Sequence, residues 1–289
     1  MSDTKASRTL LEMQLRRVLV TVDAAICCLL GVALFFAPGP IGDLIFNRST
    51  DGIHWHLLRC VGGQLLGGAF VLHKLGYSSP EFASSCYLLR FLGAALSLLL
   101  LYNSSSMTPD LIPAQYIRIA KWWCFISVIV YFLMQTISGW PLCRWFNVAS
   151  PFANSLYQLD SIASIAIGSA WIAFPKWLLH RQVNVEMDES HELCGRLMGA
   201  YFITGYLVST HAVHWKEDYQ RAIAVDTRAV ICISILMAQV WSQYAYREHW
   251  GGGHWIGISL FSSWTIICLL YRAYLTLNNR QDRRHVKTK

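Results

Sequence analysis

Eight apolar segments, each about 20 residues long, constrain the fold of this chain more than any other feature. An α-helix that rises 1.5 Å per residue needs about 20 residues to cross the hydrocarbon core of a bilayer. Charged residues make up only 14% of the chain, against roughly 25% in a soluble domain. The pattern predicts an all-α, polytopic membrane protein with eight transmembrane helices, at residues 18–37, 54–73, 85–103, 117–138, 154–174, 192–213, 222–246 and 254–275.

The distribution of basic residues predicts the orientation of these spans. With eight spans, fourteen Lys and Arg fall on the side of both termini and six on the opposite side. Cytosolic loops carry the excess of Lys and Arg, so we expect both termini to be cytosolic, in a plasma membrane or an endomembrane. The net charge of +7 therefore indicates contact with anionic lipid through the basic tail at residues 276–289, and no nucleic-acid partner.

The chain also contains an internal repeat. Residues 19–71 align without gaps on residues 156–208, a shift of 137, and 12 of the 53 positions are identical. Most of the identities are Asp, Gly, Pro, His, Arg and Asn, which are not interchangeable apolar residues. The identical pairs are Leu19/Leu156, Asp23/Asp160, Gly31/Gly168, Ala33/Ala170, Pro38/Pro175, Asn47/Asn184, Asp51/Asp188, His54/His191, Arg59/Arg196, Gly62/Gly199, Gly68/Gly205 and Val71/Val208.

The repeat divides the chain into two four-span units. Four is an even number, so both units have the same orientation, and such parallel repeats are related by an axis along the membrane normal. The predicted segments are a cytosolic amino-terminal tail at 1–17, a first unit at 18–138, a linker at 139–153, a second unit at 154–275 and the basic tail at 276–289.

An inner layer of charged residues is predicted from their depth in the spans. Asp23 lies five residues after the start of its span, and Arg90 lies five residues after the start of a span with the same direction. A charge at this depth costs about 2.5–3.5 kcal/mol on insertion scales, so it persists when it is paired or functional. We predict structural ion pairs between Asp23 and Arg90 and between Asp160 and Arg228.

A second polar layer is predicted near the opposite face, and it is the candidate ligand-binding site. It consists of the repeated residues Asp51, His54, Arg59, Asp188, His191 and Arg196. Arginine beside histidine can bind a carboxylate or lipid phosphate, and histidines can transfer protons or bind a metal. The structural alternative is that the arginines extend to the interface and bind loop carbonyls while the aspartates cap their helices.

The absence of known catalytic motifs favours a protein that is not an enzyme. The chain has no HExxH, GxSxG, phosphate-binding loop, carboxylate dyad or CxxC, and we predict no cofactor and no metal site from it. Two Asn-x-Ser sequons, at Asn47 and Asn103, fall in segments expected to be loops on the non-cytosolic side, where they are candidate glycosylation sites.

Each half resembles small four-span membrane proteins of the DoxX-like and DUF4345-like type. The resemblance is carried by the proline that closes the first helix, an Arg-x-x-Gly in the second and an arginine early in the third, which are Pro38, Arg59, Gly62 and Arg90 in the first half and Pro175, Arg196, Gly199 and Arg228 in the second. Some relatives of this type resemble assembly factors, which implies a similar role here. The duplication and the aspartates Asp23 and Asp160 depart from the pattern, so no functional residue is carried over.

Three functions are consistent with these features. The leading one is a non-enzymatic assembly factor, scaffold or regulator of another membrane protein. The alternative is a transporter, or a lipid- or anion-binding membrane protein, with its site near Arg59 and Arg196. The third is a membrane enzyme that acts on lipid with His54 or His191 as the general base.

Overall fold

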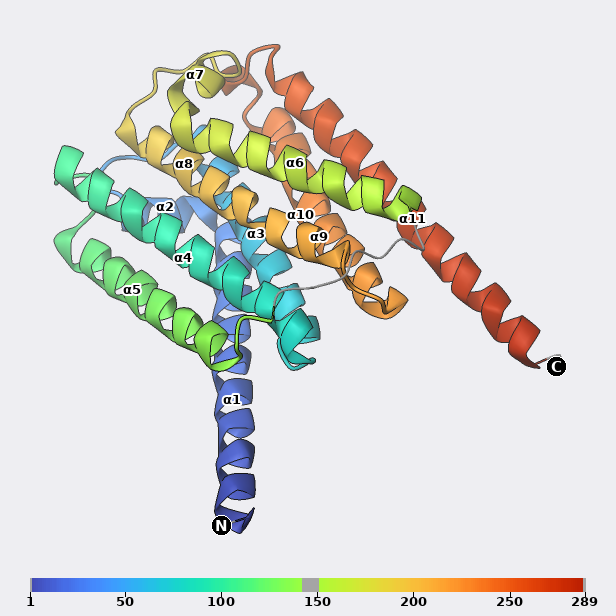
Figure 1. The fold of residues 1–289 in the computed structure, drawn as a ribbon. Coiled ribbons are helices and arrows are strands. Elements are labelled where there is room, and N and C mark those ends of the chain that lie inside the picture. Colours follow the sequence, from blue (N-terminus) through green and yellow to red (C-terminus); the bar gives the residue numbers. More distant parts are fainter. Residues whose placement is uncertain (1, 142–150, 288–289) are drawn as a thin grey trace.

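The structure is a computed structural model that describes residues 2–141 and 151–287, and this part of the chain is helical with a single isolated bridge between Val183 and Trp250. Figure 1 shows a bundle of long helices from which the amino end of α1 and the carboxyl end of α11 project. The elements are α1 (Ser2–Phe36), α2 (Pro38–Ile45), α3 (Gly52–Leu75), α4 (Pro80–Met107), α5 (Ala114–Ile137), α6 (Pro151–Ala173), α7 (Pro175–His180), α8 (Glu189–Thr204), α9 (Tyr206–Ala212), α10 (Asp218–Ala245), η1 (Arg247–His249) and α11 (His254–Lys287).

Each of the eight apolar segments falls on helix, and the segment at 192–213 falls on two helices, α8 and α9. Within the described residues, five helical segments are long and apolar enough to cross a membrane. They are Met13–Phe36, Pro80–Met107, Ala114–Ile137, Asp218–Ala245 and His254–Leu277. The chain thus has the character of an integral membrane protein, while α3, α6 and α8–α9 are not among these five segments.

The long helices are arranged as an inner and an outer set. The inner set, α3, α4, α8–α9 and α10, makes the contacts between the two halves, mainly α3 with α10 and with α8, and α4 with α8 and α9. Each outer helix packs on one inner helix of its own half, α1 on α3, α5 on α4, α6 on α8 and α11 on α10. Polar residues of α3 and α8 are accordingly buried against protein, among them His54, Gln64 and His191.

Prolines end the first helix of each half as expected. α1 stops at Phe36 and Pro38 opens the short helix α2, and α6 stops at Ala173 and Pro175 opens α7. Proline fits the first turn of a helix because its missing N–H has no partner there anyway. We refer to the end of the bundle that carries these two short helices as the α2–α7 end.

Glycines allow the first two long helices of each half to cross closely. A Cβ added at Gly62 would lie 2.7 Å from the carbonyl oxygen of Gly31, and one added at Gly199 would lie 2.7 Å from that of Gly168. These four residues are two of the repeated pairs. The close crossings α1–α3 and α6–α8 therefore explain why glycine occurs at the same positions in both halves.

Other glycines of α3 serve the contact between the halves. A Cβ at Gly63 would meet the side chain of Ser234 at 2.4 Å, and one at Gly67 would meet Ile231 at 2.4 Å, both on α10. The small residues of α3 thus pack inside the molecule, as membrane helices pack through small residues generally.

Substitution of Gly62 tests the close crossing, with Gly68 as the matched control. Both are buried in α3, but a Cβ at Gly68 would have its nearest neighbour, in Leu89, at 4.0 Å. The gain in helix propensity is the same for both alanine variants. We expect Gly62→Ala to be less stable than Gly68→Ala by about 1–3 kcal/mol, the cost of overpacking, when unfolding is measured in detergent. Equal stability of the two variants would contradict the crossing.

Candidate functional site

The inner layer of the first half is an ion pair that joins three helices. Arg90 of α4 donates to Asp23 of α1 through Nε at 2.7 Å and Nη2 at 2.9 Å, and Tyr131 of α5 donates its hydroxyl proton to the same carboxylate. Asp23 and Arg90 are both buried. The predicted pair is therefore present, and its bidentate geometry is the strong form of this interaction.

The second half repeats this arrangement with different supporting residues. Arg228 of α10 lies 2.8 Å from Asp160 of α6 through Nε, and it also donates to Ser164 at 2.6 Å. The carboxylate of Asp160 accepts hydrogen bonds from Trp264 of α11, at 3.1 Å, and from Ser209 of α9. Both predicted pairs thus link the first, third and fourth long helices of their halves.

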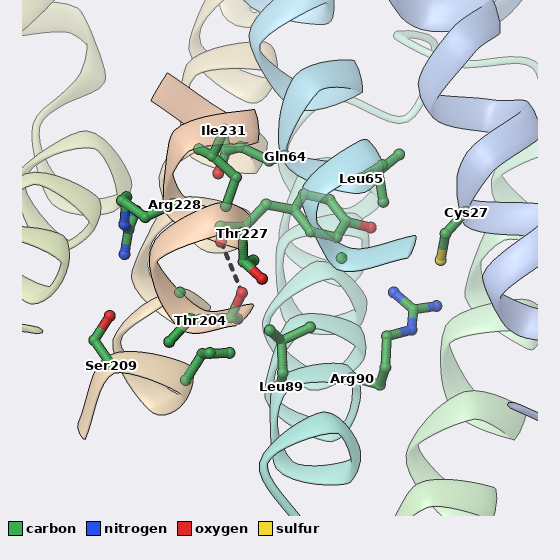
Figure 2. A pocket seen from close by; sticks show the side chains of 15 residues that line it. Cys27, Gln64, Leu65, Leu89, Arg90, Thr204, Ser209, Thr227, Arg228 and Ile231 are labelled. Atoms are coloured by element: carbon green, nitrogen blue, oxygen red, sulfur yellow. Dashed lines mark hydrogen bonds between the residues drawn. The ribbon is translucent and has the colours of Figure 1, made fainter. Parts of the chain in front are cut away.

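A small cavity lies between the two buried arginines, at the contact of the halves. Figure 2 shows Arg90 on one side and Arg228 on the other, with Thr227 and Leu89 between them. The cavity measures about 30 Å³, and a single water needs at least roughly 10–15 Å³ by this type of measure. A space of this size accommodates water and no organic substrate, so we interpret the inner layer as structural.

The outer layer is built on two helix caps. The Asp51 carboxylate accepts hydrogen bonds from the backbone N–H of Ile53, at 2.9 Å, and of His54, at 3.1 Å, so it caps α3. The ring Nδ1 of His54 reaches back to the backbone N–H of Asp51, which completes a capping box. The same box recurs with Asp188 and His191 at the start of α8.

The two capping boxes meet at the α2–α7 end. The imidazole rings of His54 and His191 lie face to face, with centroids 3.6 Å apart and planes inclined by 36°. His191 Nε2 is 3.2 Å from Asp51 Oδ2, and His54 Nε2 is 2.7 Å from the hydroxyl of Ser190. Residues 137 positions apart thus form one cluster, which we call the His–Asp cluster (Asp51, His54, Asp188, Ser190 and His191).

Arg48 ties the first half to the acidic side of this cluster. Its Nη1 lies 2.9 Å from Asp188 Oδ2 and 2.8 Å from Glu189 Oε2. All three side chains are exposed or partly exposed, so solvent screens this network and it contributes little to stability. Its geometric effect is to hold the Asp188 carboxylate against Nδ1 of His191.

Hydrogen bonds hold the pKa values of the two carboxylates in the cluster low. Burial disfavours the charged form of Asp51, but hydrogen bonds from His191 and His54 outweigh it and hold the pKa of Asp51 well below its usual value. Burial likewise opposes ionisation of Asp188, yet Ser190 and Arg48 hold its pKa low. Burial disfavours the imidazolium of His191, while the two carboxylates raise its pKa above the usual value. The cluster therefore contains two carboxylates in contact with imidazole nitrogens.

The two repeated arginines of the predicted site lie apart from this cluster. Arg59 Nε donates to the carbonyl of Phe35, at 3.2 Å, and Arg196 Nη1 donates to the carbonyl of Ile172, at 3.1 Å. Both acceptors belong to the last turn of the preceding long helix, whose carbonyls have no partner within that helix. The structure thus divides the predicted set, with the histidines and aspartates in one group and the arginines in another. The helix caps formed by Asp51 and Asp188 agree with the structural alternative, whereas Arg59 and Arg196 bind carbonyls of a helix end and not of a loop, and Arg196 Nη2 also lies 3.6 Å from Glu192 Oε2.

The sequons have different positions. Asn47 lies in the loop before α3, exposed, and its side chain donates to the carbonyl of Asp110 at 2.9 Å. Its repeat partner Asn184 donates to the carbonyl of Trp250 at 3.0 Å, so both asparagines hold neighbouring loops. The expectation that Asn103 lies in a loop is wrong, because α4 continues to Met107 and includes it.

Several residues of these sites were not identified from the sequence. Arg48, Ser190, Tyr131 and Trp264 contact the predicted aspartates but are not repeated between the halves. Arg48 could have been noticed as a basic residue next to the repeated Asn47. Nothing in the sequence marks Ser190, Tyr131 and Trp264 as site residues, because serine and aromatic residues are common in membrane helices and at their ends.

Two larger cavities lie between α6 and α11. One, of about 280 Å³, is lined by Tyr157, Trp264 and the pair Asp160–Arg228. The other, of about 320 Å³, lies nearer the α2–α7 end against Trp171 and Arg181. Leu260 lines both, and most of the remaining lining is apolar. We call these two cavities together the α6–α11 groove. The groove has room for a hydrophobic ligand.

Comparison with known families places a match over most of the chain. The family described as Domain of unknown function (DUF8292) matches residues 21–273, which include both halves. No curated protein and no solved structure matches the chain. The matched region thus covers most of both halves as one unit. The DoxX-like and DUF4345-like resemblance of each half stays a prediction.

Removal of the Asp23 charge tests the inner layer. Asp23→Asn leaves a buried arginine without its counter-charge, and we expect it to lower the free energy of unfolding by about 3–5 kcal/mol. The matched control is Asp226→Asn, whose carboxylate pairs at 2.6 Å with a partly exposed Arg272 and should cost about 0–1 kcal/mol. Unfolding in detergent measures both. A loss no larger for Asp23→Asn than for Asp226→Asn would refute the buried pair.

Proposed function

The chain belongs to the DUF8292 family, whose description names no function, and we propose that it is a non-enzymatic membrane protein that acts as an assembly factor, scaffold or regulator of another membrane protein. The observation that supports this most is the use of the repeated polar residues. Asp23, Asp160, Arg59 and Arg196, with the residues of the His–Asp cluster, all contact other parts of the same chain. Such contacts favour one rigid arrangement of helices.

We further propose that all eight apolar segments cross the membrane, as two parallel four-helix repeats with both termini in the cytosol. α3 has 24 residues, a length of about 36 Å against a hydrocarbon core of about 30 Å. α6 has 23 residues, and α8 with α9 makes a segment as long as α3. The basic carboxyl-terminal tail would then contact anionic lipid on the cytosolic side.

The surface best suited to a partner lies on α5. Its side chains Trp122, Phe125 and Ile126 are about half exposed. A cleft of about 380 Å³ next to them is also lined by Arg118 and Lys121. Two basic residues beside an apolar aromatic face fit a transmembrane helix that carries an acidic residue near the interface. Trp, Lys and Arg also anchor helices at a lipid interface, so the test must separate a protein partner from lipid.

Photo-crosslinking in the native membrane tests this partner. A photoreactive residue in place of Phe125 should give an adduct with one protein, identified by mass spectrometry. The matched control replaces Ile266, an exposed residue of α11 that we expect to face lipid. Lipid adducts alone from both positions would contradict the proposed surface. Transport or turnover by the purified protein that is lost in Arg59→Gln would contradict the non-enzymatic role.

The groove between α6 and α11 favours a second candidate function, that of a lipid-binding membrane protein or transporter. Its two cavities are mostly apolar, and charged residues, Arg228 and Arg181, line them at different depths. A chain-like amphiphile would place its tail along Leu260 and its polar group against an arginine. Neither Arg59 nor Arg196 lines these two cavities, so this site differs from the one predicted from the sequence.

A bulky residue at Leu260 tests lipid binding, because Leu260 lines both cavities. We expect Leu260→Trp to reduce by several-fold the amount of any lipid that copurifies with the protein, as measured by mass spectrometry. Ile266→Trp, on the exposed face of the same helix, should leave it unchanged. Lipid content that is the same in both variants and the parent would show that the groove does not hold it.

A further inference from the structure

The His–Asp cluster brings three metal-binding atoms together at the contact of the two halves. The ligand atoms of Asp51, His54 and His191 all lie within 4.8 Å of one another. His54 Nδ1 is 2.9 Å from Asp51 Oδ1, and His191 Nε2 is 3.3 Å from the same oxygen. Ligands bound tetrahedrally at about 2.0–2.2 Å from one zinc ion lie roughly 3.3–3.5 Å apart. Small side-chain shifts would therefore bring all three into one coordination shell.

The other nitrogen of each ring already has the partner that a metal-binding histidine needs. His191 Nδ1 is 2.9 Å from Asp188 Oδ1, and His54 Nε2 is 2.7 Å from Ser190 Oγ. The hydroxyl of Ser190 in turn donates to Asp188. A ligating histidine almost always donates its second N–H to such a group, which fixes the tautomer and turns the lone pair toward the metal. Asp188 and Ser190 thus orient both rings.

The charges and the accessibility of the cluster suit a cation. Arg48 pairs with Asp188 and Glu189, so its charge is balanced by groups that are not proposed as ligands. The histidines are almost fully buried, whereas the side chain of Asp51 is 30% exposed and opens the site at the α2–α7 end. Binding would displace the long contact, 3.3 Å, between His54 Nδ1 and the backbone N–H of Asp51.

From this geometry we propose that Asp51, His54 and His191 bind one divalent transition-metal ion. Two imidazoles and one carboxylate suit zinc, with a fourth position left for water or an external ligand. The site departs from the sequence prediction of no metal and no cofactor. Two ligands come from one half and the third from a residue in the other half, so no local spacing reveals it. A bound ion would also join the two halves, and this proposal does not depend on the proposed scaffold function.

Zinc titration of the full-length protein in detergent, after removal of metal with EDTA, tests the site. We expect one zinc ion per chain by calorimetry and an increase in melting temperature on zinc addition. Asp51→Asn keeps a good helix-capping residue while it removes the charged ligand. We expect Asp51→Asn and His191→Gln each to weaken zinc binding about tenfold or more. His180→Gln, an exposed histidine of α7, should bind zinc as the parent does.

Each outcome decides the proposal. Absence of stoichiometric binding in the parent overturns it, and so does equal affinity in the parent and Asp51→Asn. If His191→Gln fails to fold, Asp51→Asn alone decides, with its helical content checked by circular dichroism. A cobalt-substituted parent should show the absorption bands of a tetrahedral site, and these bands should be missing in Asp51→Asn.

Discussion

The neutralisation of charge inside an apolar bundle is the constraint on which the rest of this structure depends. An arginine or aspartate at this depth is costly unless it is paired, and the chain solves this twice, with Arg90 on Asp23 and Arg228 on Asp160. Each aspartate lies 13 residues before the end of its helix, about 20 Å from the α2–α7 end. Each pair fixes three long helices of its half relative to one another.

The halves are joined by a different set of contacts. The glycines of α3 allow α10 to approach closely, and the two capping boxes at the α2–α7 end share hydrogen bonds between Asp51, His54 and His191. The same residue types thus have two roles, because Asp51 caps its own helix and also binds a histidine of the other half. Hydrogen bonds thus join the halves at the α2–α7 end. The arrangement also leaves an apolar groove between α6 and α11.

The sequence predicted those features that depend on how far a residue lies along its apolar segment and on the helix period. Helix positions follow from the apolar segments, and the Asp23–Arg90 pair follows from counting residues along two segments that are expected to run in the same direction. The separation of Arg59 from His54 follows from the helix period, because residues five apart on α3 lie about 140° apart around the helix axis. The contact of His54 with Ser190 could not be predicted, because it depends on how the two halves dock. The assignment of Asn103 to a loop failed because Asn103 is the last residue of the apolar segment at 85–103 and α4 does not end there but at Met107.

A density map of the full-length protein in lipid nanodiscs tests the central claim most directly, which is that repeated polar residues hold the two halves as one unit. We predict that the rings of His54 and His191 lie in contact, with centroids about 3.6 Å apart, at the α2–α7 end of the bundle. About 20 Å deeper, the pairs Asp23–Arg90 and Asp160–Arg228 should appear at a common level. A map in which the halves are well resolved but His54 and His191 are separated, or either arginine lacks its aspartate, would contradict it.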